Sequence, residues 1–147
     1  MEKYDPQVAK QVWERVRHRE DEGQLPAVLQ QMLGTAVEDG TVCRRLQQKF
    51  TGWHREVLGR IAQRKDGCAS CLRGILRLHA EQVPPVAATV GAKQPEAALR
   101  HCLRNTLQGI RQWNGLSSHP EFGPVFGVLA QQEAELAQWL LQLLGSL

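Results

Sequence analysis

The sequence predicts an all-α fold, a bundle of four long helices preceded by a short N-terminal helix. Hydrophobic residues make up 42% of the 147-residue chain and aromatic residues only 5%, a composition that favours helices over strands. Apolar residues recur every three or four positions along five stretches of the chain, as they do on the buried face of a helix. One long connection without this period separates two pairs of helices.

The first stretch is a short helix with a narrow apolar face. Asp5-Pro6 provides an N-cap followed by proline at the first helical position. The apolar face consists of Val8, Val12 and Val16, with Trp13 beside them. Charged residues and a glycine at 17–23 are expected to end this helix. We therefore predict a helical extension over residues 1–22 that packs on a bundle formed by residues 23–147 or on a second subunit.

The second and third helices form the first pair of the predicted bundle. One is expected to run from Leu25-Pro26 to about Phe50, and the other from about Trp53 to Glu81, with Thr51-Gly52 between them. Small residues in the middle of the second helix, Ala36 and Gly40, would let a neighbouring helix approach closely. The inward positions of the third helix are His54, Leu58, Ile61, Lys65, Cys68, Leu72, Ile75 and His79.

The long connection covers residues 83–95 and contains three prolines. At about 3.3 Å per residue it can return along the whole length of a bundle. The fourth helix is expected from Pro95 to about Trp113, and Ser117 to Glu121 offers an N-cap for a fifth helix that continues to Leu147. Two short connections on either side of one long crossover are typical of ferritin-like bundles.

Two charged residues interrupt the apolar faces of these helices. The inward positions of the last helix are Phe122, Phe126, Leu129, Leu136, Leu140, Leu143 and Leu147, and the gap in this series is occupied by Glu133. Lys65 interrupts the third helix in the same way. A buried charge is costly unless another group neutralises it.

Two segments of the chain are similar to motifs of the ferritin-like superfamily, in particular of small rubrerythrin-like proteins. Ala62–Ile75 resembles the second-helix motif, in which Glu-x-x-His precedes a Leu-Arg-Gly-Ile-like turn. Leu129–Leu136 resembles the fourth-helix motif with the same Glu-x-x-His. The resemblance extends from about Leu25 to Leu147 and implies a four-helix bundle with a dinuclear metal site.

When the metal ligands of the family are assigned one by one to positions of this sequence, the resemblance implies that most of the metal site is lost. The Glu of the first helix falls on Ala36, although a register slip would bring Glu38 there instead. The remaining five positions fall on Lys65, Cys68, Thr106, Glu133 and Leu136, of which Glu133 alone keeps the family residue. One Glu, one Cys and one Lys cannot neutralise and orient two metal ions, so no metal or other cofactor is expected.

The resemblance places Lys65 and Glu133 at the same level of the bundle, and we predict that they form a buried ion pair. The ammonium group would replace the lost metal beside the remaining carboxylate, with Thr106 and Cys68 completing the hydrogen bonds. Two alternatives stay open: Lys65 could extend to solvent while Glu133 is protonated or hydrated, or Arg64 could compete for the carboxylate.

The four cysteines raise the possibility of a redox or zinc site. Cys68-x-x-Cys71 lies inside a predicted helix rather than at a helix N-terminus after a strand, which argues against a thioredoxin-type motif. A zinc site would require Cys43 and Cys102 to converge on this pair. We expect them instead to be small buried apolar side chains.

The polar, acidic residues Met1–Asp5, which do not resemble a signal peptide, and the four cysteines lead us to expect a cytoplasmic protein. The net charge of +3 comes from scattered Lys and Arg and does not indicate nucleic-acid binding, and no apolar run approaches the length of a membrane span. The sequence contains no Ser-His-Asp order, phosphate-binding loop or paired-carboxylate motif, which disfavours an enzyme. It therefore predicts a non-catalytic structural or interaction module that forms a homodimer. The alternative is a metal-dependent oxidoreductase or storage protein with a reduced site around Glu133 and Cys68.

Overall fold

The computed structural model describes residues 6–79 and 94–147, and for residues 10–24 it describes the backbone alone. Within these ranges the chain forms helices and no strand, so the predicted all-α class is confirmed. The helices are α1 (Pro6–Gln47), α2 (Gly52–Leu78), α3 (Pro95–Leu116) and α4 (Gly123–Gly145).

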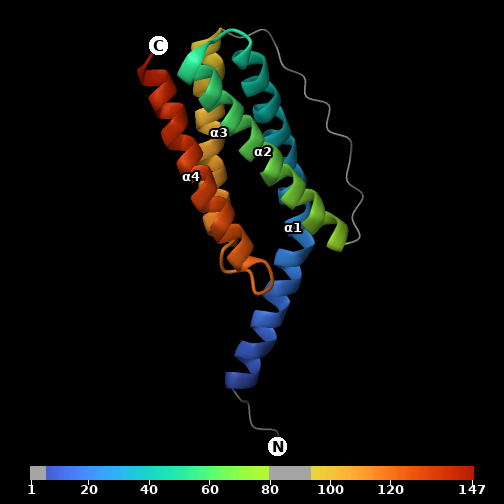
Figure 1. Cartoon of the computed structure of the whole chain (residues 1–147). Coiled ribbons are helices and arrows are strands. Elements are labelled where there is room, and N and C mark those ends of the chain that lie inside the picture. Colours follow the sequence, from blue (N-terminus) through green and yellow to red (C-terminus); the bar gives the residue numbers. More distant parts are fainter. Residues whose placement is uncertain (1–5, 80–93) are drawn as a thin grey trace, which may run out of the picture.

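The helices form two antiparallel pairs that pack against each other, α1 with α2 and α3 with α4 (Figure 1). Between the pairs, α2 lies next to α4 and α1 lies next to α3. α2 and α3 run in the same direction, so the chain returns from one end of the bundle to the other between them (Figure 1). Most of the predicted connection at 83–95 lies outside the described residues.

The first helix differs from the prediction, because α1 is continuous through residues 17–23. It passes through Gly23 and Pro26, although glycine and proline disfavour a helix interior by about 1 and 3 kcal/mol. Buried Leu25 and Leu29 hold the adjoining turns on the bundle, and a nucleated helix extends at a small cost per residue. The prediction of a separate short helix is therefore wrong.

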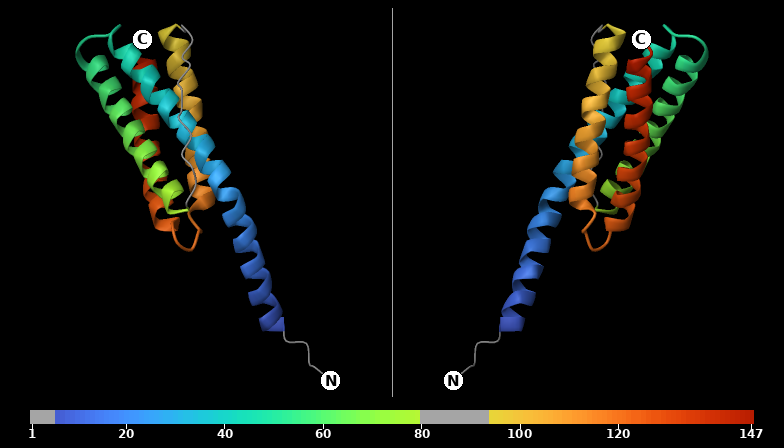
Figure 2. Two further views of the ribbon diagram at one scale, coloured as in Figure 1. Left: turned by 90° about the vertical axis from the view of Figure 1, so that its right-hand side faces the viewer. Right: turned by 90° about the vertical axis from the view of Figure 1, so that its left-hand side faces the viewer.

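The first part of α1 projects past the loop that joins α3 to α4 (Figure 2). We call residues 6–24 of this projecting helix the arm. The predicted apolar face at Val12, Trp13 and Val16 falls on side chains outside the described part of the chain.

The bundle core consists of two apolar clusters with a polar level between them. The arm-end cluster is centred on Leu29, Leu33, Leu72, Leu76, Trp113 and Phe126. The far-end cluster is centred on Leu58, Ile61, Leu99, Leu136, Leu140 and Leu143. The predicted inward positions of the last helix are buried except for Leu147, which is 54% exposed because α4 ends at Gly145.

The turn between α3 and α4 is stabilised by His119, which lies inside the segment 117–121 predicted to cap the last helix. The backbone N–H groups of Glu121 and Phe122 donate to Nδ1 of His119 at 3.2 and 3.1 Å. Ser117 instead donates its hydroxyl to the carbonyl of Asn114 at 2.7 Å. The helix begins one residue later than expected, at Gly123.

Candidate functional site

Each helix contributes one polar residue to the level between the two apolar clusters. These residues are Asp39 of α1, Lys65 of α2, Thr106 of α3 and Glu133 of α4, and none is more than 5% exposed. We call this group the polar centre. Gly40 lets α1 and α2 approach each other here, because an added Cβ would lie 3.3 Å from Oδ1 of Asp66 and 3.5 Å from Cβ of Lys65.

The ammonium group of Lys65 lies between the other three residues of the polar centre. Its Nζ donates to Oε2 of Glu133 at 2.8 Å and to Oγ1 of Thr106 at 3.1 Å. The hydroxyl of Thr106 in turn donates a hydrogen bond to the carbonyl of Cys102 at 2.7 Å, so it both accepts and donates. The structure therefore contains the predicted Lys65–Glu133 ion pair with Thr106 beside it, and Lys65 does not extend to solvent.

Arg64 does not compete for Glu133. Its guanidinium instead lies 3.3 Å from Oε2 of Glu135 and 5.5 Å from the ring centroid of Trp139. Both members of this second pair are partly exposed, with 40% and 56% of their side-chain surfaces accessible.

Asp39 is the member of the polar centre that sequence reasoning missed. Its Oδ2 lies 3.5 Å from Nζ of Lys65, and Asn105 donates to its Oδ1 at 3.0 Å. Among the described residues Oδ2 has no hydrogen-bond partner. Because Asp39 lies three residues after Ala36 and four before Cys43, helical spacing puts it on the same inward face. This spacing could have identified it.

Burial and charge compete at the polar centre. Burial lowers the pKa of Lys65, but the carboxylates of Glu133 and Asp39 outweigh it, so that this pKa lies above its ordinary value of 10.5. Burial also raises the pKa of Asp39, and the nearby Lys65 and Asn105 offset this only in part. Lys65 is consequently an ammonium at neutral pH and is not available as a nucleophile or a general base.

Cys68 borders the polar centre without joining its hydrogen bonds. In the described part of the chain, the hydrogen bonds of Lys65 and Glu133 do not include this thiol. Burial and the carboxylate of Glu133 raise the pKa of Cys68 to about 12. A space of about 30 Å³ lies next to Lys65, Cys68 and Glu133, enough for about one water molecule.

The four cysteines do not converge on one point. Cys43 and Cys102 belong to the far-end cluster, where the hydrogen bond with Cys43 and burial raise the pKa of Cys102. Cys68 belongs to the arm-end cluster, with Cys71 packed against it. All four are free thiols in two separate places, which does not fit a four-cysteine zinc site.

The side chains at the polar centre also do not fit a dinuclear metal site. Ala36 and Leu136 have no ligand atoms, and the ammonium of Lys65 already lies against Glu133. Among the side chains that the structure describes, those of residues 6–9, 25–79 and 94–147, no group of three or more His, Cys, Asp or Glu is placed to hold a metal ion. The four side chains of the polar centre form an ion-pair network that is almost wholly buried.

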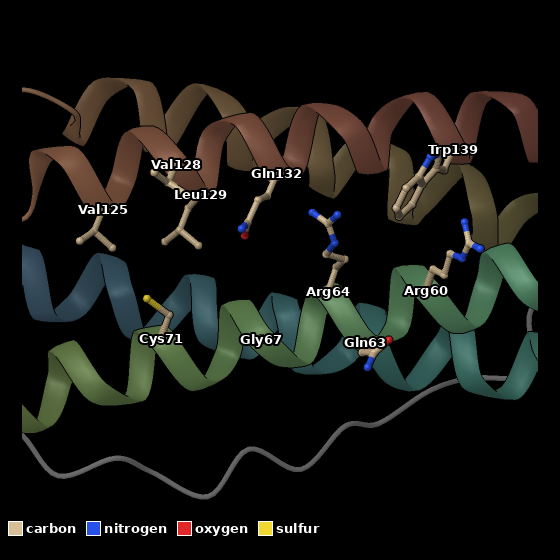
Figure 3. Close-up of a pocket in the computed structure, with 10 residues that line it drawn as sticks. All are labelled: Arg60, Gln63, Arg64, Gly67, Cys71, Val125, Val128, Leu129, Gln132 and Trp139. Carbon is tan, nitrogen blue, oxygen red and sulfur yellow. The ribbon is translucent and has the colours of Figure 1, made fainter.

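A groove open to solvent lies between α2 and α4 (Figure 3). It has a volume of about 720 Å³, and Val125, Val128 and Leu129 of α4 face Cys71 of α2 across it. Arg60, Gln63, Arg64, Gly67, Gln132 and Trp139 complete its lining. The groove could not be predicted from the sequence, because its lining mixes apolar and charged residues without a regular period.

None of the helices in the described ranges has the length and apolar content needed to cross a bilayer. No protein-family model, curated protein or solved structure matches the chain.

Proposed function

We propose that the chain is a ferritin-like bundle protein, related in plan to rubrerythrin-like proteins, that has lost a dinuclear metal site and acts as a non-catalytic structural or interaction module. The observation that supports this most directly is the ammonium of Lys65, 2.8 Å from Glu133 and 3.5 Å from Asp39 at the middle of the bundle. A fixed positive charge between inward carboxylates takes over the charge-neutralising part of a metal ion's role without its chemistry.

The burial of the polar centre supports a structural role. Its four residues are at most 5% exposed, and the raised pKa of Lys65 keeps the amine protonated. An internal network of this kind links all four helices and fixes their register, as buried polar groups do in some helical assemblies.

The second candidate is a metal-binding oxidoreductase or storage protein with a reduced site at Glu133 and Cys68. The space of about 30 Å³ beside both side chains favours it. Two observations weigh against it: a thiol with a pKa of about 12 is a poor source of thiolate, and one oxygen of Glu133 already accepts from Lys65.

Metal analysis separates the two candidates. Protein purified without chelators should contain well under one transition-metal ion per chain by mass spectrometry, and adding Fe²⁺, Mn²⁺ or Zn²⁺ should leave its melting temperature unchanged. One ion per chain that is lost in both Glu133→Gln and Cys68→Ser would establish the second candidate. Two ions per chain with a visible iron spectrum would refute the loss of the dinuclear site.

A cytoplasmic location and a dimeric state are part of the same proposal. The four free cysteines are typical of a reducing compartment. Cell fractionation with an antibody against the chain tests the location, and recovery in an oxidising compartment with paired cysteines would contradict it.

A further inference from the structure

The arm extends α1 beyond the bundle, where none of the described helices α2, α3 and α4 accompanies it (Figure 2). Residues 6–24 are about 28 Å long at 1.5 Å per residue. A helix of this length is marginal in water by itself, and most helices in proteins are stabilised by packing one apolar face. The arm therefore needs a surface to pack on.

The helical backbone of the arm places its apolar residues together. Val8, Val12 and Val16 lie on one face because they are four residues apart, and Trp13 lies next to them. Lys10 and Glu14 fall on the opposite face. Val8, whose side chain is described, is 54% exposed.

The groove between α2 and α4 has the dimensions and composition to accept such a helix. Its α4 side extends from Val125 to Trp139, about 21 Å along the helix axis. Within it Val125 and Val128 are 37% and 53% exposed, and Leu129 forms part of the floor (Figure 3). These residues are the kind of surface into which an amphipathic helix lays its apolar side chains.

The apolar surface continues from the groove toward the arm end of the bundle. Leu78 lies seven residues, or two turns, after Cys71 and so falls on the same face of α2. It is 74% exposed. A helix that enters from the arm end would cover Leu78 first, then Cys71, and would end near Arg64 and Trp139.

We propose that the arm of a second copy of this chain lies in the α2–α4 groove, and that two copies exchange arms about a two-fold axis near the arm end of the bundle. This inference rests on the proposed role as an interaction module and names the partner. The two-fold axis places the arm of each copy in the groove of the other copy, so one dimer contains two such helix-in-groove contacts. Stable complexes bury roughly 800 Å² of surface on each partner. Two exchanged arms bury about twice the area of a single arm and so come closer to this value.

A cross-linking experiment on the full chain tests the position of the arm. Cys71 is the half-exposed thiol of the groove, while Cys43, Cys68 and Cys102 are buried. In a Val16→Cys variant, oxidised glutathione should take two electrons and two protons from the new thiol and Cys71, which form a disulfide between chains. The product should have the mass of two chains and should be absent in Val16→Cys/Cys71→Ser.

The matched control for this variant is Glu14→Cys on the opposite face of the arm, which should cross-link at least about tenfold more slowly. Equal rates for Val16→Cys and Glu14→Cys, or persistence of the product without Cys71, would overturn the assignment of the groove.

Light scattering provides a second measurement that does not depend on thiol chemistry. The wild-type chain should be a dimer, and Val128→Glu should raise the dimer dissociation constant at least about tenfold, because it buries a charge under the arm. Leu141→Glu is the control, since Leu141 is 56% exposed on α4 but outside the groove. A monomeric wild type, or a dimer that tolerates Val128→Glu, would overturn the proposal. If the purified protein bound two metal ions per chain, the proposed loss of the metal site would be refuted. The cross-linking and light-scattering results would still decide whether the arm lies in the groove.

Discussion

Two ion pairs join α2 to α4, and they begin at neighbouring residues. Lys65 pairs with Glu133 at 2.8 Å, and their side chains are 4% and 6% exposed. Arg64 pairs with Glu135 at 3.3 Å, and their side chains are 40% and 56% exposed. One step along a helix turns the side chain by about 100°, which here moves a cation from the surface to the middle of the core.

The comparison shows that burial, more than the presence of opposite charges, decides what an ion pair does. Water and salt screen the Arg64–Glu135 pair, and Arg64 also finds a favourable position over the ring of Trp139. Lys65 has exchanged water for the oxygens of Glu133, Thr106 and Asp39. Each member of the buried pair therefore depends on the other.

The largest effect is expected when one member of the buried pair is removed. Lys65→Met should lower the free energy of unfolding by about 3–5 kcal/mol, because it leaves the carboxylate of Glu133 buried without a counter-charge. Glu133→Leu should cost less, about 1–3 kcal/mol, because the ammonium of Lys65 keeps Asp39 as a second carboxylate at 3.5 Å. Urea denaturation at pH 7 measures both, and a loss below about 1 kcal/mol would show that the pair does not carry the stability assigned to it.

A smaller effect is expected at the hydrogen bond that supports Asp39. Asn105→Leu keeps the number and branching of the side-chain heavy atoms but removes the donor to Oδ1, which should cost about 1–3 kcal/mol. Gln108→Leu, on an exposed position of the same helix, is the control and should change stability by less than about 0.5 kcal/mol. Equal losses from the two variants would mean that Asn105 does not support the polar centre.

The buried groups also predict how stability depends on pH. The pKa of Cys68 is raised from 9.0 to about 12, so above pH 9 the unfolded chain loses this proton while the folded chain keeps it. Stability should therefore fall as the pH rises from 9 toward about 12, and the raised pKa of Lys65 adds to the loss above 10.5. In urea titrations with a reducing agent, Cys68→Ala should lose less stability across this window. Parallel curves for the two proteins would contradict the prediction.

The smallest effect is expected at the exposed pair. Arg64→Met should cost about 0–1 kcal/mol, and this cost should shrink further in high salt. Arg64 is next to Lys65 on the same helix, and both variants replace a cation by Met. Arg64→Met is therefore the matched control for Lys65→Met. A salt-independent loss of several kcal/mol would mean that the two pairs do not differ as described.

Much of the bundle and part of its centre could be predicted from the sequence. The interruptions at Lys65 and Glu133 were visible because both fall on otherwise apolar faces, and such interruptions require a partner. Asp39 was missed because its helix lacks a clear apolar position there: Ala36, Asp39, Gly40 and Cys43 form a face of small residues. The close approach at Gly40 became clear only from its distance to Asp66 and Lys65.

The course of α1 could not be predicted from local signals. The charged stretch at 17–23 and Pro26 are each typical of a helix boundary. Helix α1 continues through both, because the helical turns that begin at Leu25 are packed on the bundle and the preceding residues extend an existing helix. Local propensities do not include this effect. The groove was missed for a similar reason, since it depends on how two helices diverge rather than on either sequence.

The most direct test of the buried pair is a pair of double-mutant cycles at pH 7. One cycle combines Lys65→Met with Glu133→Leu, and the other combines Arg64→Met with Glu135→Leu. In the buried cycle the double variant should be markedly more stable than the sum of the single losses predicts, with a coupling energy of about 2–3 kcal/mol, because Glu133 is no longer left without a counter-charge when Lys65 is removed. The contact between Lys65 and Asp39 is lost in Lys65→Met and in the double variant alike, so it cancels from the coupling energy. In the exposed cycle the coupling should be about 0–1 kcal/mol. Equal coupling energies in the two cycles would contradict the account.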